Sequence, residues 1–151
     1  MPELKSEFLF TIRVTVDRLH DVGETLFDKR HIDMLDDGSF EGPKLKGIVL
    51  EGMDQKIFRS DGAMNPNVRI ILKTDDDALI YMYYTGIRYG SPEVMQRIAD
   101  GETADPSEYY LRNTPYFETS VEKYDWLNRI VSVGVGRRIP DHAEYNVFQI
   151  L

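Results

Sequence analysis

The sequence predicts an all-β, mainly antiparallel protein, folded as a small closed up-and-down β-barrel with one or two short helices. Apolar and polar residues alternate along most of the 151 residues, which is the pattern of half-buried strands. Turn-forming residues interrupt this alternation roughly every 8–12 residues, a spacing typical of hairpins and too short for parallel crossovers. About eight or nine such strands must close into a barrel or pair as a sandwich, because an open sheet of that width leaves long bare edges.

The first expected strand spans residues 8–16, where Phe8, Phe10, Ile12 and two valines share one parity. Further strands are expected at residues 25–34, 40–50, 55–59, 68–74, 78–85, 109–118, 130–135 and 145–150. The breaks between the early strands are rich in Asp, Asn, Gly and Pro, as in Asp36-Asp37-Gly38, Asp61-Gly62, Asn65-Pro66-Asn67 and Asp75-Asp76-Asp77. These compositions favour tight turns and predict a meander.

Two short helices interrupt the strands. Ser91, Pro92 and Glu93 have the order of an N-cap, a proline in the first turn and an acidic residue near the positive end of the helix dipole. An apolar stripe follows, and Gly101 predicts the end of this helix. A second helix is expected over residues 121–128.

Composition limits the possible functions. The length suits one domain, 1–151, and the absence of cysteine excludes thiol chemistry and disulfide staples. A formal net charge of −8 would repel nucleic acid. We also expect no membrane association, because no apolar run approaches the roughly 20 residues of a membrane helix. The first residues lack the pattern of a signal peptide, so the expected location is cytoplasmic.

Several segments, in order, resemble a known family. They are 40–47, Gly52-Met53-Asp54, Asp61-Gly62, 72–76, 78–81, Gly86-Ile87-Arg88, 105–112, Phe117-Glu118-Thr119 and 124–128. Together they resemble the domain of unknown function numbered 3237, found in bacteria and fungi. The resemblance implies an antiparallel β-barrel and little about chemistry. The chain has Asp37-Gly38 where the family usually has two glycines, and Asp77 where it usually has glycine, which implies altered turns.

A barrel of this size can hold one ligand where alternate residues of its strands converge. One parity of the strand near residue 110 collects Tyr110, Arg112 and Thr114. If this parity faces inward, Arg112 is a catalytic candidate that would hold or polarise a substrate oxygen. The alternative is a structural ion pair that helps to close the barrel.

Two carboxylates are candidates for proton transfer. Asp54 fits the Gly-x-Asp pattern of the resembled family, and a partly desolvated carboxylate at a barrel mouth can act as a general acid or base. The alternative is a turn aspartate that accepts backbone N–H groups. Glu118 is the second candidate.

The expected substrate-binding residues are Tyr83, Tyr110, Trp126 and Asn128. Tyr81 and Tyr83 share one face of their strand and Tyr84 takes the other, so a register error would exchange which tyrosines point inward. The tyrosines could instead form core and subunit interface, and Trp126 could simply pack at one end of the barrel.

No metal site and no cofactor are expected. His20, His31 and His142 are far apart in the sequence and lack neighbours with metal-ligand spacing. The chain also lacks a nucleophile elbow, a phosphate loop and a dinucleotide fingerprint.

These features support a small-molecule-binding barrel, and the sequence leaves open whether it is an enzyme. The leading hypothesis is a cofactor-independent acid–base enzyme, an isomerase, cyclase or hydro-lyase, acting on an aromatic, polyketide-like or terpenoid metabolite. The alternatives are a non-catalytic binding or carrier module and a structural oligomeric protein with a plugged lumen. Abundant Tyr, Phe and Met residues make a homo-oligomer, a dimer or higher, an expectation under all three.

Overall fold

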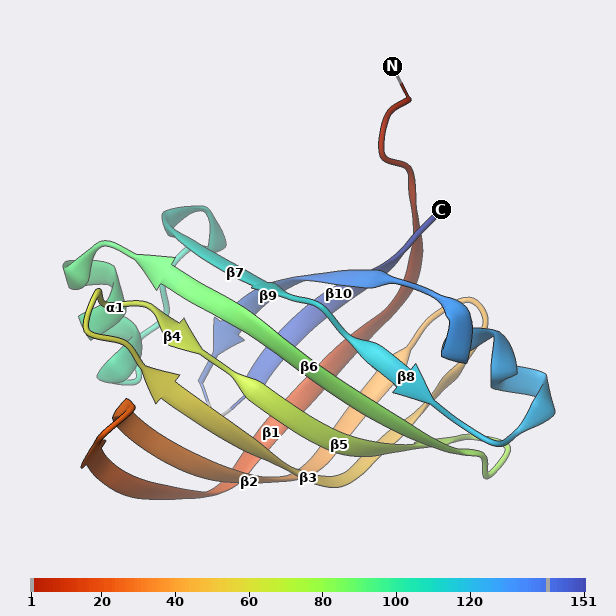
Figure 1. Ribbon diagram of the computed structural model, residues 1–151, viewed down its shortest axis with the longest axis horizontal. Helices are drawn as coiled ribbons and strands as arrows, with labels where there is room; N and C mark the ends of the chain where they lie inside the picture. The colour runs from red at the N-terminus through yellow and green to blue at the C-terminus, as the bar shows by residue number, and fades with distance from the viewer. Residues whose placement is uncertain (1, 141) are drawn as a thin grey trace.

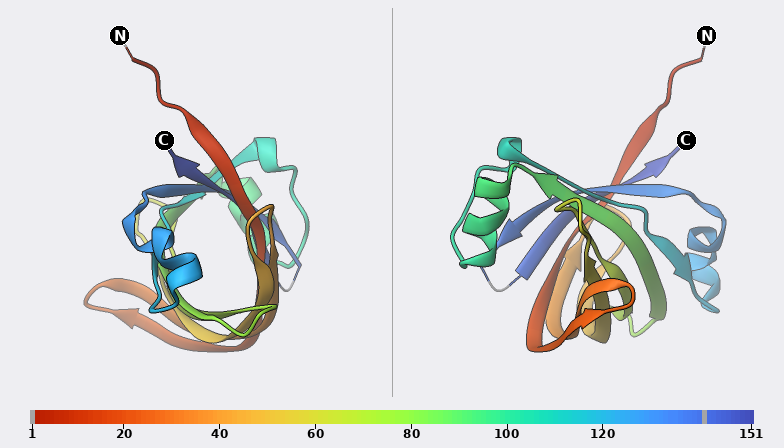
Figure 2. Two further views of the ribbon diagram at one scale, coloured as in Figure 1. Left: turned by 90° about the vertical axis from the view of Figure 1, so that its right-hand side faces the viewer. Right: turned by 60° about the vertical axis from the view of Figure 1, so that its left-hand side comes forward.

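The computed structural model describes residues 2–140 and 142–151, and the strands of this part of the chain close into a barrel (Figure 1). Around the ring, the order of hydrogen-bonded neighbours is β1-β2-β3-β5-β6-β7-β9-β10, and β10 pairs again with β1. All of these pairings are antiparallel. The left view of Figure 2 shows the ring of strands. The predicted all-β closed barrel is therefore confirmed, with eight strands in the ring.

The elements follow one another along the chain with short connections. They are β1 Ser6–Thr25, β2 Asp28–Glu41, β3 Lys46–Phe58, β4 Met64–Asn65, β5 Asn67–Thr74, β6 Leu79–Gly90, α1 Pro92–Ala99, η1 Pro106–Glu108, β7 Tyr109–Asn113, β8 Tyr116–Glu118, η2 Glu122–Arg129, β9 Ser132–Ile139 and β10 His142–Ile150. The short strand β4 pairs with both β3 and β6, the same neighbours as β5, and the short strand β8 pairs with β6.

Apolar side chains of alternating parity fill much of the barrel. On β1, Phe10, Ile12 and Val14 are buried, as the sequence pattern predicts. Phe8, expected on the same face, is 40% exposed and Leu9 is buried, because the β1–β10 register shifts between Phe8 and Phe10. The ring of Phe10 packs against Phe40 at a centroid distance of 5.5 Å and against Phe117 at 5.8 Å. Burying such large rings supplies a major share of the hydrophobic stabilisation.

The first hairpin is longer than predicted. Strand β1 continues to Thr25 and pairs with β2 to its end, and this two-stranded arm projects beyond the ring in the left view of Figure 2. Its tip exposes Leu26 and Phe27. The expected turn at Asp36-Asp37-Gly38 is wrong, because Asp37 lies inside β2 with a φ of 57°. The pairing of β2 with β3 keeps its register here, but the pairing of β1 with β2 shifts between Arg13 and Val16, so that Asp37 lies in a bulge of β2 against β1.

The two positions that distinguish the chain from the resembled family both adopt left-handed backbone conformations. Asp37 has a φ of 57° and Asp77, in the β5–β6 turn, has a φ of 67°. Glycine occupies such conformations without a steric cost, and aspartate tolerates them better than most residues.

The helices lie at opposite ends of the barrel (Figure 1). Helix α1 begins at the predicted N-cap, where the Ser91 side chain accepts a hydrogen bond from the Val94 N–H, and Gly101 follows it with a φ of 81°. The second predicted helix forms as the 3-10 helix η2, which packs Tyr124 and Leu127 into the core.

Candidate functional site

The end of the barrel nearest α1 gathers polar side chains inside the lumen. Strand pairing brings them together, because inward positions near the ends of β2, β3, β6, β7, β9 and β10 surround the same space. The charged and hydroxyl-bearing residues that line this space are Asp54, Lys56, Tyr84, Arg88, Arg138 and Tyr145. We refer to this set as the polar lumen.

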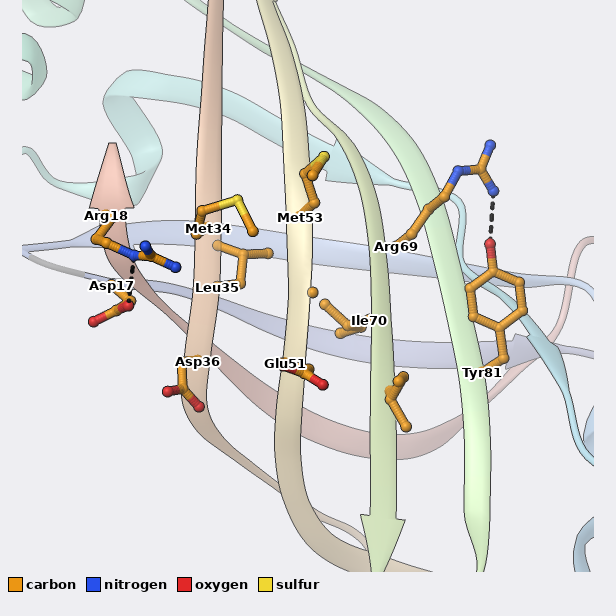
Figure 3. A pocket seen from close by; sticks show the side chains of 12 residues that line it. Asp17, Arg18, Met34, Leu35, Asp36, Glu51, Met53, Arg69, Ile70 and Tyr81 are labelled. Atoms are coloured by element: carbon orange, nitrogen blue, oxygen red, sulfur yellow. Dashed lines mark hydrogen bonds and ion pairs between the residues drawn. The ribbon is translucent and has the colours of Figure 1, made fainter. Parts of the chain in front are cut away.

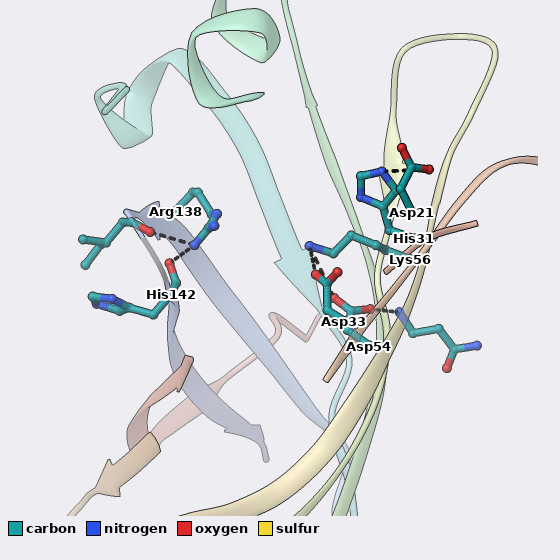
Figure 4. Close-up of polar contacts among 9 residues, drawn as sticks. Asp21, His31, Asp33, Asp54, Lys56, Arg138 and His142 are labelled. Carbon is teal, nitrogen blue, oxygen red and sulfur yellow. Dashed lines mark hydrogen bonds and ion pairs between the residues drawn. The ribbon is translucent and has the colours of Figure 1, made fainter. Parts of the chain in front are cut away.

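On the acidic side of the polar lumen, the Lys56 ammonium lies between the carboxylates of Asp33 and Asp54 (Figure 4). Asp33 on β2 lies directly opposite Asp54 on β3, and Lys56 is two residues further along the same face. The Lys56 Nζ lies 2.7 Å from Asp33 Oδ2 and 3.8 Å from Asp54 Oδ2. Because like charges opposite each other in a ladder repel, the shared ammonium is needed to hold the pair together.

Asp54 is 7% exposed, and its carboxylate is held in place by the backbone. Its Oδ1 accepts a hydrogen bond of 3.0 Å from the Asn67 N–H. Burial raises the pKa of Asp54 above its ordinary value, and this effect outweighs the lowering by Lys56 and by that hydrogen bond. A carboxyl group in this environment is easier to protonate than an exposed one, which suits proton transfer near neutral pH.

The basic side of the polar lumen comes from β6 and β9. Arg88 is 7% exposed, and burial together with the nearby charge of Arg138 lowers its pKa from the ordinary value. Arginine remains cationic under such conditions because its ordinary pKa is so high. The Arg138 guanidinium donates to the carbonyl oxygens of Ile139 and His142.

Two tyrosines close the lumen between these charges. Tyr84 and Tyr145 are buried with ring centroids 5.5 Å apart, and burial raises the pKa of both phenols. Glycines on β9 give the Tyr145 ring its space, because a Cβ at Gly136 would lie 2.5 Å from a ring carbon of Tyr145. Both phenols therefore remain neutral hydrogen-bond donors over the physiological range.

The free space among these side chains is small. The cavity measures about 40 Å³, and its apolar walls include Val14, Leu35, Val68 and Leu111. Since one water needs roughly 10–15 Å³ by this measure, the space suits about three waters or one small polar group. A metabolite-sized ligand would need side chains at the mouth, such as Lys56, to move.

A larger hollow of about 490 Å³ lies on the outer face of β2, β3 and β5 (Figure 3). Its walls carry the exposed side chains Asp17, Arg18, Asp36, Glu51 and Arg69, together with apolar groups such as those of Met34 and Met53. All of these charged side chains are exposed, whereas the Asp54 carboxyl group and the Arg88 guanidinium of the polar lumen are buried. On chemical grounds the polar lumen is the better candidate site.

Of the residues predicted to form the site, Asp54 lies in the polar lumen. The parity expected for the strand near residue 110 is wrong, because Tyr109, Leu111 and Asn113 are buried and Tyr110 and Arg112 lie on the outer face. There the Arg112 guanidinium stacks on the Tyr110 ring, 4.7 Å from its centroid.

The other predicted residues also lie away from the polar lumen. Tyr83 is on the outer face, stacked on Tyr116, and Glu118 is exposed on β8. At the opposite end of the barrel, Lys44 lies over the Trp126 ring. Asn128 exchanges two hydrogen bonds with the backbone of Thr119. The inward residues of β6 are Ile80, Met82 and Tyr84, the alternative register noted for this strand.

The sequence analysis did not identify Asp33, Lys56, Arg88, Tyr84 or Tyr145 as site residues. Arg88 follows Ile80, Met82 and Tyr84 on the same parity, but strand β6 continues five residues beyond the predicted end. The sequence signal that could have identified Arg88 is its position, because it is a charged residue on the strand face whose other members are apolar or aromatic.

Among residues 2–140 and 142–151, no group of three or more His, Cys, Asp or Glu side chains is arranged to hold a metal ion. No helix in this part of the chain is both long and apolar enough to cross a membrane.

The fold and site define a small antiparallel β-barrel with a charged, buried pocket at one end. A family model described as a protein of unknown function, DUF3237, matches residues 4–150. The chain belongs to this family. A UPF0311 protein of Rhodopseudomonas palustris is 32% identical over 151 residues, covering 99% of each chain. A UPF0311 protein of Clostridium acetobutylicum is 32% identical over 150 residues, covering 98% of this chain and 95% of the relative.

Solved structures share the barrel. The conserved protein of unknown function from Rhodopseudomonas palustris has a TM-score of 0.96 and 32% identity, with full coverage of both chains. A β-barrel-like protein from Acinetobacter baumannii has a TM-score of 0.87 and 37% identity, covering 100% of this chain and 98% of the other. An enzyme from Penicillium herquei has a TM-score of 0.74 at 23% identity, covering 100% of this chain and 98% of the other. The last likeness extends to the fold alone.

Proposed function

We propose that this protein binds a small molecule in the polar lumen and catalyses a cofactor-independent proton transfer on it, with Asp54 as the general acid or base. The observation that carries the proposal is the buried Asp54 carboxyl group, whose pKa is raised by burial and which shares one cavity with the Arg88 guanidinium. A raised pKa brings a carboxyl group closer to the operating pH, where proton transfer in both directions is efficient.

The groups around Asp54 supply the other requirements of such a reaction. Arg88 would stabilise the negative charge that develops on a carbonyl oxygen when a neighbouring C–H bond loses its proton. The neutral phenols of Tyr84 and Tyr145 would donate hydrogen bonds to the same oxygen. Isomerisation, cyclisation and loss of water from a carbonyl-bearing aromatic, polyketide-like or terpenoid metabolite can each begin with this step.

The barrel fold itself accommodates catalysis. The Penicillium herquei protein with this fold is described as an enzyme. At 23% identity its reaction does not transfer to this chain, so the proposal depends on the residues of the lumen.

Hydrogen–deuterium exchange tests the proposal without knowledge of the natural substrate. A panel of small ketones and keto acids is incubated with the protein in D2O, and loss of the α-proton signals is followed by NMR. We expect faster exchange with the wild-type protein than in buffer, and a return to the buffer rate with Asp54→Asn. Glu118→Gln is the matched control, because it removes an exposed carboxylate from the outer face.

Wild-type protein that leaves every probe at the buffer rate, or an Asp54→Asn variant that keeps the full rate, contradicts the proposal. Circular dichroism of each variant establishes that the fold is retained. A second candidate function, a non-catalytic binding module, is favoured by the small size of the cavity. This second function predicts that wild type and Asp54→Asn both bind a ligand and that neither accelerates exchange of its α-protons.

A further inference from the structure

Arg88 differs from the other buried charges in the partners that its side chain finds. Asp33 pairs with Lys56, Asp54 accepts the Asn67 N–H, and Glu144 lies between two arginines. Among residues 2–140 and 142–151, the Arg88 side chain forms no hydrogen bond or ion pair, and its Nε is buried without an acceptor. Leaving an ion buried and uncompensated costs several kcal/mol.

The surrounding charges do not compensate Arg88. The Lys56 ammonium lies on the two carboxylates of the acidic side, and its positive charge reduces what those carboxylates offer to Arg88. Arg138 adds positive charge nearby, and its guanidinium donates to two backbone carbonyl oxygens. Asp54 raises the pKa of Arg88 by less than Tyr145 and Tyr109 do, and burial and Arg138 lower that pKa overall.

The position of Arg88 aims it at the cavity. It lies on β6 opposite Leu111 of β7 and Met64 of β4, and all three residues line the space of about 40 Å³. Room for about three waters is also room for the three heavy atoms of a carboxylate. A guanidinium presents a planar fork of N–H donors that matches the two oxygens of a carboxylate.

We propose that Arg88 is the receptor for the carboxylate of a small organic acid, which binds in the lumen with its charged group against the guanidinium. The proposal rests on the proposed function, because it concerns the same cavity, and it narrows the substrate class to carboxylic acids. In such a complex Asp54 would exchange a proton at a carbon near the bound carboxylate. Arg88 would orient the acid and the two phenols would complete the hydrogen bonds to its oxygens.

The test follows the Arg88 side chain directly. Protein labelled with 15N-arginine gives a resonance for the Arg88 Nε–H, which is assigned by its absence in Arg88→Met. Formate, whose three heavy atoms match the present space, and acetate, which adds one methyl group, are titrated at constant ionic strength, with acetamide as the neutral counterpart of acetate. We expect a saturable shift of this resonance with both acids and none with acetamide.

Variants separate the possible causes. Arg88→Met is expected to weaken acetate binding at least about tenfold, and Arg88→Lys, which keeps the charge without the fork, to bind more weakly than wild type. Arg69→Met is the matched control, because Arg69 is on the outer face and donates to the Tyr81 hydroxyl. Asp54→Asn should keep acetate binding although it loses proton transfer. Failure of this inference and failure of the proposed function are therefore distinguishable.

Three results would overturn the carboxylate assignment. They are an Arg88 resonance that no acid moves, acetate binding that survives unchanged in Arg88→Met and Arg88→Lys, and a resonance that moves with 4-nitrophenolate but not with formate or acetate.

Discussion

Removal of the Lys56 ammonium is expected to be among the most destabilising changes in the polar lumen. Asp33 is fully buried, its Oδ2 lies 2.7 Å from Lys56 Nζ, and its Oδ1 has no hydrogen-bond partner among the described residues. Lys56→Met keeps most of the apolar stem of the side chain and deletes only the charge. The Asp33 carboxylate is then left buried and uncompensated, with the Asp54 carboxylate opposite it.

Breaking a buried ion pair in this way costs roughly 3–5 kcal/mol, a large part of the stability of a typical domain. For a chain of this length that loss corresponds to a fall in melting temperature of about 6–20 °C. Urea denaturation followed by circular dichroism measures the change in the free energy of unfolding. Lys73→Met is the matched control, because Lys73 pairs with Asp77 at 3.5 Å in an exposed site, and we expect it to cost less than about 1 kcal/mol.

A double variant checks the cause. In Asp33→Asn combined with Lys56→Met the buried Asp33 charge is absent and Asp54 keeps its hydrogen bond from the Asn67 N–H, so we expect most of the lost stability to return. A loss below about 1 kcal/mol in Lys56→Met, or a double variant as unstable as the single one, would refute the assignment of Lys56 as the compensating charge.

Three further predictions concern other buried polar groups. Because the pKa of Asp54 is raised in the folded protein, its ionisation opposes folding as the pH rises above about 4. In urea titrations, Asp54→Asn should therefore gain stability relative to wild type with rising pH. A stability difference that stays constant with pH would contradict this. Burial acts to raise the pKa of Glu144, but its hydrogen bonds with Arg13 and Arg137 lower that pKa overall. Glu144→Gln should therefore lower the free energy of unfolding by about 1 kcal/mol at pH 7, and this loss should shrink as the pH falls below the ordinary glutamate pKa. A loss of stability that does not change with acid would argue against those bonds. Both polar atoms of the Asn113 side chain are buried without a hydrogen-bond partner among the described residues. Asn113→Leu should therefore raise the free energy of unfolding by about 1–2 kcal/mol, and a strongly destabilised variant would indicate a partner.

The architecture could be predicted from the sequence because strands and helix ends depend on residues that are close together along the chain. Alternation on β1 predicted the buried Phe10 and Ile12, and the order Ser91-Pro92-Glu93 predicted the start of α1. Such signals depend on neighbours within a few residues along the chain, which is why they could be read without a structure.

Local signals failed where an irregularity changed the register. The aspartates before Gly38 predicted a turn, but Asp37 forms a bulge in a strand that continues to Glu41. On β7, Tyr110 and Arg112 were predicted to face the lumen. The residues that face inward are instead Tyr109, Leu111 and Asn113. A shift of one residue exchanges the two faces of a strand, and alternation alone does not say which face is inside when both carry large side chains.

By itself the sequence determined an acidic, cysteine-free antiparallel barrel and singled out Asp54 as a candidate. Only the tertiary structure decided that Asp54 shares its end of the lumen with Asp33, Lys56 and Arg88. Those residues come from three strands, and their meeting depends on register and closure. It also decided which charges are compensated, because burial and distance set the energy of a charge, and both arise only when the barrel closes.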